Sequence, residues 1–298
     1  MKRIILLVIY FGTVLVSVFA VSTNREVNRP SNATLKLLEA SDTGNESLVK
    51  QLIKDGADVN FVSEDLYGTS LHYASIRGHE KIVNLLIENG ANVNAVGEFG
   101  RTPLYSAITY GNSYERIVSK LLQKGSSVNT VTDDTDTTPI CFAVSGGYDK
   151  IVKMLIDNGA DVNFKDKESK VSPLHQAALY GYEKVAKKLI HNGAFVNSTD
   201  KNGVQPIHLA ASGGYEKVVK ELIRHKADVN IKDNENSTPL HYAADGGNTR
   251  GYEKTIERLI RKGAEINVRD ENGRTPIYVA KMKGYDNIVE ILEHAKNL

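Results

Sequence analysis

The chain of 298 residues contains one cysteine, Cys141, and no tryptophan. A single thiol excludes an intramolecular disulfide framework and any zinc site built from cysteines. Neither sign of charge is in excess, since 37 Lys and Arg against 36 Asp and Glu give a formal net charge of +1. Nucleic-acid-binding proteins usually carry a clustered basic face, so nothing indicates such a partner. The content of 41% hydrophobic and 24% charged residues is ordinary for a folded protein.

Long apolar runs are missing except at the amino terminus. Lys2 and Arg3 precede a run without charge over residues 4–21, in which Val18 and Ala20 stand three and one places before a cleavage point. These are the features of a secretory signal peptide. We expect a signal peptide at residues 1–20 and a linker at 21–33, which makes the protein secreted, or periplasmic in a bacterium.

An uncleaved membrane anchor is the alternative interpretation of this segment. A run of about 18 apolar residues is at the lower edge of what spans a bilayer. The basic residues before the run would keep the amino terminus in the cytoplasm and place the rest of the chain outside. Contact with a membrane is expected only in this case.

Beyond the linker, one sequence unit recurs to the end of the chain. Its tail, of the type Gly-Ala-Asp-Val-Asn, ends at Asn60, Asn94, Asn129, Asn163, Asn197, Asn230 and Asn267. An opening of the type Thr-Pro-Leu-His follows eight or nine residues later, with its fourth residue at positions that include His72, Tyr105, His175, His208 and His241.

This opening, recurring with a period of about 33 residues, resembles the ankyrin repeat. The resemblance covers about residues 34–298 and implies an all-α solenoid, in which each unit is a pair of antiparallel helices followed by a β-hairpin-like finger. The unit boundaries fall at about residues 34–64, 65–97, 98–132, 133–166, 167–200, 201–233, 234–270 and 271–298.

Local chemistry supports this resemblance independently. Thr or Ser before Pro supplies a helix N-cap oxygen, and Pro fits the first helical position. Ile82, Val83 and Leu86 show the helical spacing of one apolar face, which two short helices cannot bury without a neighbouring unit. Lys226 replaces the Gly of the six other tails. We expect Lys226 in the left-handed conformation that Gly adopts at helix ends.

The recurring histidines occupy the same place in each unit, so they form a row instead of converging on one point. The resemblance implies that each hydrogen-bonds within the turn that starts its helix. Cys141 stands at the same place in the fourth unit and is expected to be a buried, small hydrophobic residue.

Asp133, Asp134 and Asp136 form the one dense acidic cluster of the sequence. Carboxylates at alternate positions can bind calcium, but the central Gly and the closing Glu of a calcium-binding loop are missing. We interpret the cluster as a solvated finger tip. The sequence shows no catalytic group, cofactor site or metal triad, and we expect neither an enzyme nor a small-molecule substrate.

The resemblance also indicates where a partner would bind. In ankyrin units the two residues before the helix-breaking Gly face the concave groove, and in units two, three and five they are large. The candidate binding residues are Ile76, Arg77, Tyr110, Leu179 and Tyr180, with Tyr67 and Phe99 on adjoining finger segments and Asp133, Asp134 and Asp136 as an acidic rim. Scattered surface apolar residues are the alternative interpretation.

Asn32 and Asn45 are candidate N-glycosylation sites, since both match the acceptor pattern. Asn197 matches it too, but as a tail asparagine it is expected to support the finger.

The leading hypothesis is a secreted module that binds a protein of unknown identity. A membrane-anchored scaffold is the second hypothesis, and a host-directed effector rests on analogy alone, because ankyrin arrays carry many functions on one scaffold.

The amino terminus yields the first testable prediction. Export should remove residues 1–20, so mass spectrometry of the exported protein should find a chain that begins at Val21. An exported chain that retains Met1 would contradict cleavage and support the anchor.

Overall fold

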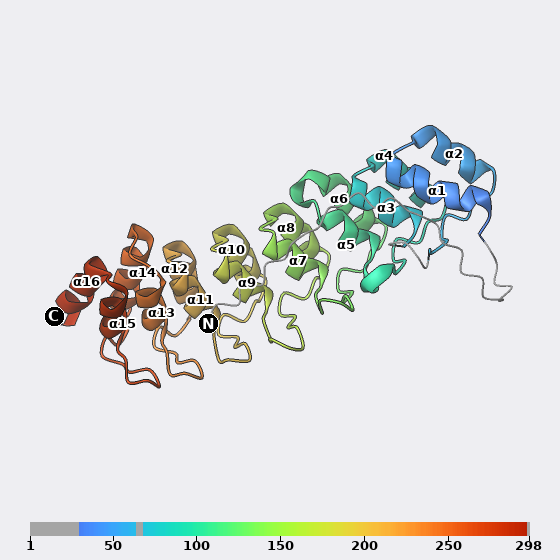
Figure 1. The fold of residues 1–298 in the computed structure, drawn as a ribbon. Coiled ribbons are helices and arrows are strands. Elements are labelled where there is room, and N and C mark those ends of the chain that lie inside the picture. The colour runs from blue at the N-terminus through green and yellow to red at the C-terminus, as the bar shows by residue number, and fades with distance from the viewer. Residues whose placement is uncertain (1–29, 64–67, 297–298) are drawn as a thin grey trace.

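The computed structural model describes residues 30–63 and 68–296, which form sixteen α-helices in eight consecutive pairs (Figure 1). The first helices are α1 (Asn32–Thr43), α3 (Ser70–Arg77), α5 (Pro103–Ile108), α7 (Pro139–Ser145), α9 (Pro173–Leu179), α11 (Pro206–Ser212), α13 (Pro239–Gly246) and α15 (Pro276–Lys283). The second helices are α2 (Glu46–Lys54), α4 (Glu80–Glu88), α6 (Glu115–Gln123), α8 (Asp149–Asp157), α10 (Glu183–His191), α12 (Glu216–Arg224), α14 (Arg250–Arg261) and α16 (Asp286–Lys296). The predicted helical solenoid of eight units is therefore confirmed.

The first unit begins slightly earlier than the repeat pattern suggests. Helix α1 starts at Asn32, inside the expected linker, because the Ser31 hydroxyl accepts a hydrogen bond from the backbone N–H of Thr34 at 3.1 Å and caps the helix. The predicted signal peptide lies outside the described residues.

The opening motif starts the first helices in the expected way. Six of them have Pro at the first helical position after an extended N-cap residue. In unit three, the Thr102 hydroxyl accepts a hydrogen bond from the backbone N–H of Tyr105 at 3.4 Å. The cap satisfies one of the donors that a helix start leaves unpaired.

A tyrosine of one unit packs on the glycine that breaks the first helix of the unit before it. Gly181 has a φ of +71°, and a Cβ there would lie 2.5 Å from the ring of Tyr215. Glycine is needed at this position both for the left-handed backbone and for the close approach of the ring. The same contact joins Gly78 to Tyr114, Gly111 to Tyr148, Gly147 to Tyr182 and Gly214 to Tyr252.

The units share one continuous hydrophobic core, which extends from Leu37 in α1 to Leu292 in α16. Leu71 of α3 and Leu86 of α4 are completely buried, as are their counterparts Leu174 and Leu189 in unit five. Neither helix of a pair could bury these side chains alone, so each unit depends on its neighbours.

The tail asparagines also join neighbouring units. The Asn60 side-chain amide donates a hydrogen bond to the carbonyl of Gly90 at 3.0 Å, and its oxygen accepts one from the backbone N–H of Asn92 at 2.7 Å. Asn197 donates to the carbonyl of Lys226 at 3.2 Å, the longest of the six such bonds. This bond confirms the supporting role expected for Asn197.

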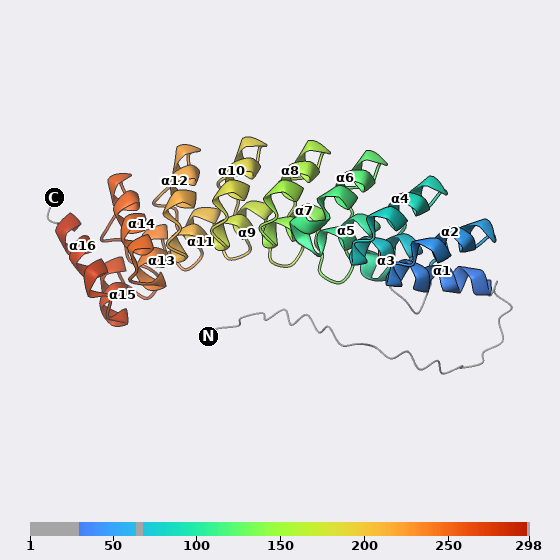
Figure 2. The same ribbon diagram turned by 90° about the horizontal axis from the view of Figure 1, so that it is seen from above.

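Figure 2 shows the array as an arc, with the second helices on the outer, convex side and the first helices toward the concave side. The fingers project from one side of the array (Figure 1) and contain no β-strand within residues 30–63 and 68–296. They are hairpin-shaped turns, and several neighbouring fingers are linked by a backbone hydrogen bond, such as that from Asp133 N–H to the Phe99 carbonyl at 2.9 Å. In the described part of the chain, no helix combines the length and apolar character that crossing a bilayer requires.

Insertions lengthen two units locally. In unit three the extra residues form a short 3₁₀ turn, η2 (Gly111–Tyr114), ahead of α6. In unit seven they extend α14 to 12 residues, against 9 in α12. Both insertions lie between the two helices of a unit, so the stacking on neighbouring units is preserved.

Lys226 has a φ of +69°, which confirms the predicted left-handed conformation. A second testable prediction follows from the cost of this conformation. A Cβ built at the equivalent Gly193 or Gly263 contacts nothing within 4 Å, so the cost at Lys226 comes from the backbone alone. Lys226→Gly should raise the free energy of unfolding by about 1 kcal/mol, measured by urea denaturation. The control is Lys262→Gly, at a φ of −101°, which should not stabilise the protein. A midpoint that Lys226→Gly leaves unchanged would contradict strain at this residue.

Candidate protein-binding surface

The predicted groove residues lie at the ends of the first helices. Ile76 and Arg77 end α3, Tyr110 follows α5, and Leu179 and Tyr180 stand at the end of α9. Tyr110, Leu179 and Tyr180 are exposed, whereas Ile76 is half-buried. The ring of Tyr110 packs on the ring of Tyr114, with centroids 5.3 Å apart.

Arg77 is oriented by the first unit. Its Nε donates to Oδ1 of Asp42 in α1 at 2.6 Å, and its Nη2 donates to Oδ2 at 3.3 Å. This two-point contact fixes the plane of the guanidinium group. The guanidinium of Arg77 is therefore already paired with the Asp42 carboxylate before any partner binds.

Helix α5 and the finger that follows unit two together build the most structured part of the surface. Phe99 lies exposed in the 3₁₀ turn η1 (Glu98–Gly100), and the guanidinium of Arg101 lies 5.4 Å from the ring centroids of both Phe99 and Tyr105. Such contacts between a cation and two aromatic rings fix the positions of all three side chains relative to one another. The candidate Tyr67 lies outside the described residues.

A small pocket opens beside this cluster, between units two and three. Its volume is about 50 Å³. It is lined by His72, Tyr73, Ile76, Glu98, Arg101, Tyr105, Ser106 and Thr109. The space is too small for a metabolite. It could accommodate one apolar side chain of a partner.

Exposed valines extend the surface along the first three fingers. Val62, Val96 and Val131 each follow a tail asparagine by two residues, and all three are exposed. The later fingers carry Lys165, Thr199, Lys232 and Arg269 at the same position. This row was not predicted from the sequence, although aligning the seven tails would have revealed it. At this position the fingers are thus apolar in units one to three and polar or basic in units four to seven, although Phe195 is exposed in the tail of unit five.

The row of large groove residues is interrupted at unit four. That unit offers Ser145 and Gly146, and the ring of Tyr148 packs against Gly146. Leu179 and Tyr180 therefore form a separate exposed pair in unit five. The structure places Ile76 at the pocket together with Arg101, whose guanidinium lies against Phe99, and it leaves the unit-five pair apart. Tyr110 follows α5 in unit three.

The acidic cluster lies at a finger tip with Asp133 and Asp134 exposed and Asp136 half-buried, but two of its carboxylates are paired. Asp134 Oδ2 accepts from Nη2 of Arg101 at 2.7 Å, and Asp136 accepts a hydrogen bond from the backbone N–H of Lys167. Both carboxylates therefore link neighbouring fingers, and their ion pairs leave little acidic rim.

The recurring histidines hydrogen-bond within the opening turn, as predicted, and also reach the next unit. Nδ1 of His72 accepts from the backbone N–H of Thr69 at 3.1 Å, so Nε2 carries the proton and donates to the carbonyl of Arg101 at 3.0 Å. His175, His208 and His241 donate in the same way at 3.0–3.1 Å. These histidines are structural, and their lone pairs are already in use.

Cys141 is buried, as predicted, and the Thr138 hydroxyl donates to its Sγ at 3.2 Å. Burial raises the pKa of its thiol, so the thiolate is disfavoured. The residue is a packing element in place of a histidine.

The candidate glycosylation asparagines stand at helix starts. Asn32 is the exposed first residue of α1, not part of a linker. Asn45 caps α2, because its Oδ1 accepts from the backbone N–H of Leu48 at 3.1 Å. A glycan would be attached to Nδ2 and would leave the capping Oδ1 in place, and both asparagines are exposed, so both remain candidate acceptors.

A family model describing ankyrin repeats in three copies matches residues 37–132, 112–200 and 174–270. The chain therefore belongs to the ankyrin-repeat family. Ankyrin repeats typically serve as protein–protein interaction modules, and proteins built from them are generally not enzymes. A search of curated proteins found no match to the chain.

The histidine row generates a prediction on pH. Burial lowers the pKa of His72 to about 4, although its hydrogen bond to Arg101 favours the charged ring. In the unfolded chain the residue takes up its proton near pH 6.5. The unfolded state therefore binds more protons between these values, and stability falls as the pH falls from about 6.5 to about 4, by about 3 kcal/mol for this residue.

Urea denaturation at several pH values tests this. His72→Gln should show a smaller loss of stability between pH 7 and pH 5 than the parent, because its side chain does not titrate. His294→Gln, at an exposed position in α16, is the control and should keep the parental slope. Equal slopes in parent and His72→Gln would contradict the neutral buried ring.

Proposed function

We propose that the protein is a secreted binding module that holds a protein partner on the concave surface and fingers of units two and three, with Leu179 and Tyr180 of unit five as a second contact. The observation that carries this proposal is the packed cluster of Phe99, Arg101 and Tyr105 beside an open pocket. Aromatic and Arg anchors surrounded by polar residues are the composition of interface hot spots.

The distribution of exposed apolar groups supports this end of the array. The three exposed valines lie on the fingers of units one to three, the same end of the array that carries the exposed Phe99 and Tyr110. None of these side chains is needed to fill the core, which stacking of the helices already completes. An apolar surface that packing does not require is typical of an interaction site. The partner segment is therefore expected to present apolar side chains.

Export is part of the proposal and rests on the sequence of residues 1–21. A membrane-anchored scaffold presenting the same surface is the alternative. The mature amino terminus distinguishes the two, since the surface is the same in both.

Photo-crosslinking can test the surface while the partner is still unidentified. A photoreactive phenylalanine analogue at Phe99 of the full-length protein should crosslink to one extracellular protein. The same analogue at Tyr278 in α15, an exposed position at the other end of the array, should not. Crosslinks from Tyr278 alone would place the partner on the C-terminal units and contradict the proposal.

Binding of the captured protein then provides the quantitative prediction. The double variant Tyr110→Ala with Tyr180→Ala should bind it at least about 30-fold more weakly, since truncating even one hot-spot side chain costs about 2 kcal/mol or more. Tyr278→Ala with Met282→Ala removes a similar exposed apolar surface from unit eight and should bind like the parent. Circular dichroism must first show unchanged folding. Parental affinity in the first variant and weaker binding in the second would show that the partner binds the C-terminal end of the groove.

A further inference from the structure

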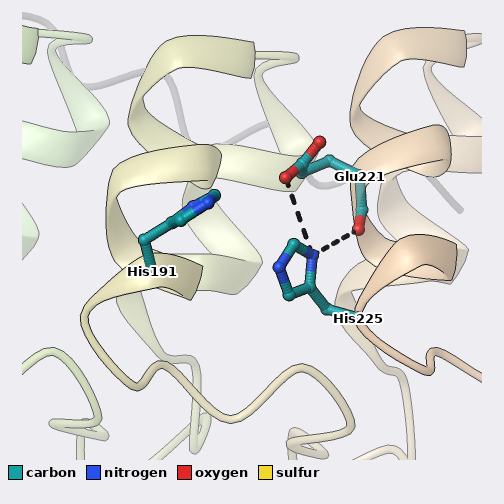
Figure 3. A group of neighbouring side chains, drawn as sticks. All are labelled: His191, Glu221 and His225. Carbon is teal, nitrogen blue, oxygen red and sulfur yellow. Dashed lines mark hydrogen bonds and ion pairs between the residues drawn. The ribbon is translucent and has the colours of Figure 1, made fainter.

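His191, Glu221 and His225 come together between the second helices of units five and six. One ligand atom from each side chain lies within 4.8 Å of the other two. Figure 3 shows the His191 ring directed from α10 toward the His225 ring, with the Glu221 carboxylate beside it. The two ring centroids are 5.3 Å apart. No metal triad was expected from the sequence, in which 30 positions separate His191 from Glu221.

His225 stands where three other units have an asparagine. Asn89, Asn158 and Asn192 close the ends of their helices by donating from Nδ2 to a backbone carbonyl at 2.8 Å. The Nδ1–H of His225 makes the corresponding bond to the Glu221 carbonyl at 3.0 Å. An asparagine would suffice for this cap. The imidazole adds a second nitrogen, Nε2, that the cap does not use.

The same logic fixes the protonation of His191. Its Nδ1 lies 2.7 Å from the carbonyl of Lys187, which can only accept a hydrogen bond. Nδ1 therefore carries the proton, and Nε2 carries the lone pair. Both histidines thus have their Nε2 lone pairs available for a metal ion. The backbone carbonyls hold the rings by their other nitrogens, as is usual for metal-binding histidines.

Glu221 breaks a charge pattern of the array. At the equivalent position, Lys188 in α10 and Arg258 in α14 pair with an acidic residue at the start of the preceding second helix. The preceding second helix of Glu221 starts with Glu183, another acid. Glu221 cannot form that bridge.

The carboxylate of Glu221 is nevertheless almost fully buried, with a side-chain exposure of 7%. The nearest cationic partner is the largely exposed Arg224, 3.5 Å away, and Nδ1 of His225 lies 3.6 Å from the other oxygen. A buried carboxylate with such distant partners is costly. A divalent cation would compensate its charge.

We propose that His191, Glu221 and His225 form a zinc site on the convex side of the array, binding through Nε2 of both histidines and one Glu221 oxygen. Two imidazoles and a carboxylate are a ligand set that Zn²⁺ takes, with a fourth position left to water. Zn–ligand bonds of about 2.0–2.2 Å require the three ligand atoms to move closer together. Rotation of the exposed His191 side chain can supply this movement. The ion would join α10 to α12 and clamp units five and six.

Titration of the full-length, metal-free protein with ZnCl₂ tests the site. Calorimetry should give one Zn²⁺ per chain with a Kd below about 10 µM, and Zn²⁺ should raise the urea midpoint because it binds the folded state. Co²⁺ in place of Zn²⁺ should give the visible absorption of a tetrahedral nitrogen–oxygen site. Mg²⁺ at the same concentration should not bind, since it avoids imidazole ligands.

Three conservative variants provide the decisive comparison. His225→Asn restores the cap found in Asn192, and His191→Asn and Glu221→Gln remove the other ligands with little change in size. Each should weaken Zn²⁺ binding more than tenfold and abolish the rise in the urea midpoint, while the folded state is retained. His294→Gln should bind like the parent. Equal Zn²⁺ affinity in parent and variants, or weak binding without one-to-one stoichiometry, would show adventitious binding only and overturn the proposal.

Discussion

Burial of apolar helix faces between neighbouring units is the interaction on which this structure depends. A pair of helices of about nine residues has too little core to be stable alone. The continuous core from Leu37 to Leu292 exists because every unit completes the one before it. The tyrosines on glycines, the histidines and the tail asparagines all act at these same junctions. Each of them connects one unit to the next and to no other.

Because stacking of the units already buries the apolar core, the residues at the groove and on the fingers are free to serve binding. Arg101 shows how the two roles meet. It lies between the rings of Phe99 and Tyr105 and pairs with Asp134 of the next finger, so the scaffold itself pre-organises the surface. Side chains fixed in this way lose little conformational entropy on binding. The later fingers, with lysines and an arginine in place of valines, offer a different chemistry.

The fold could be predicted from the sequence because its signals are local and repeated. Pro at a helix start, Gly at a helix end and the left-handed Lys226 each follow from backbone chemistry within a few residues. The pairing of Asp134 with Arg101 could not be predicted, because it depends on how one finger lies against the next. The same is true of His191 and His225, which are 34 positions apart and meet only because the units stack at a fixed spacing.

The junction between units five and six differs from the others in two respects. The backbone at Lys226 is held in a conformation that L-residues rarely adopt, and the asparagine bond that joins it to unit five is the longest of its kind. An array connected only between neighbours can open at one junction while the units on either side stay folded. Opening at this junction would leave a block of five units and a block of three. The aromatic groups proposed to bind the partner all belong to the larger block, so it could keep its ligand while the smaller one separates.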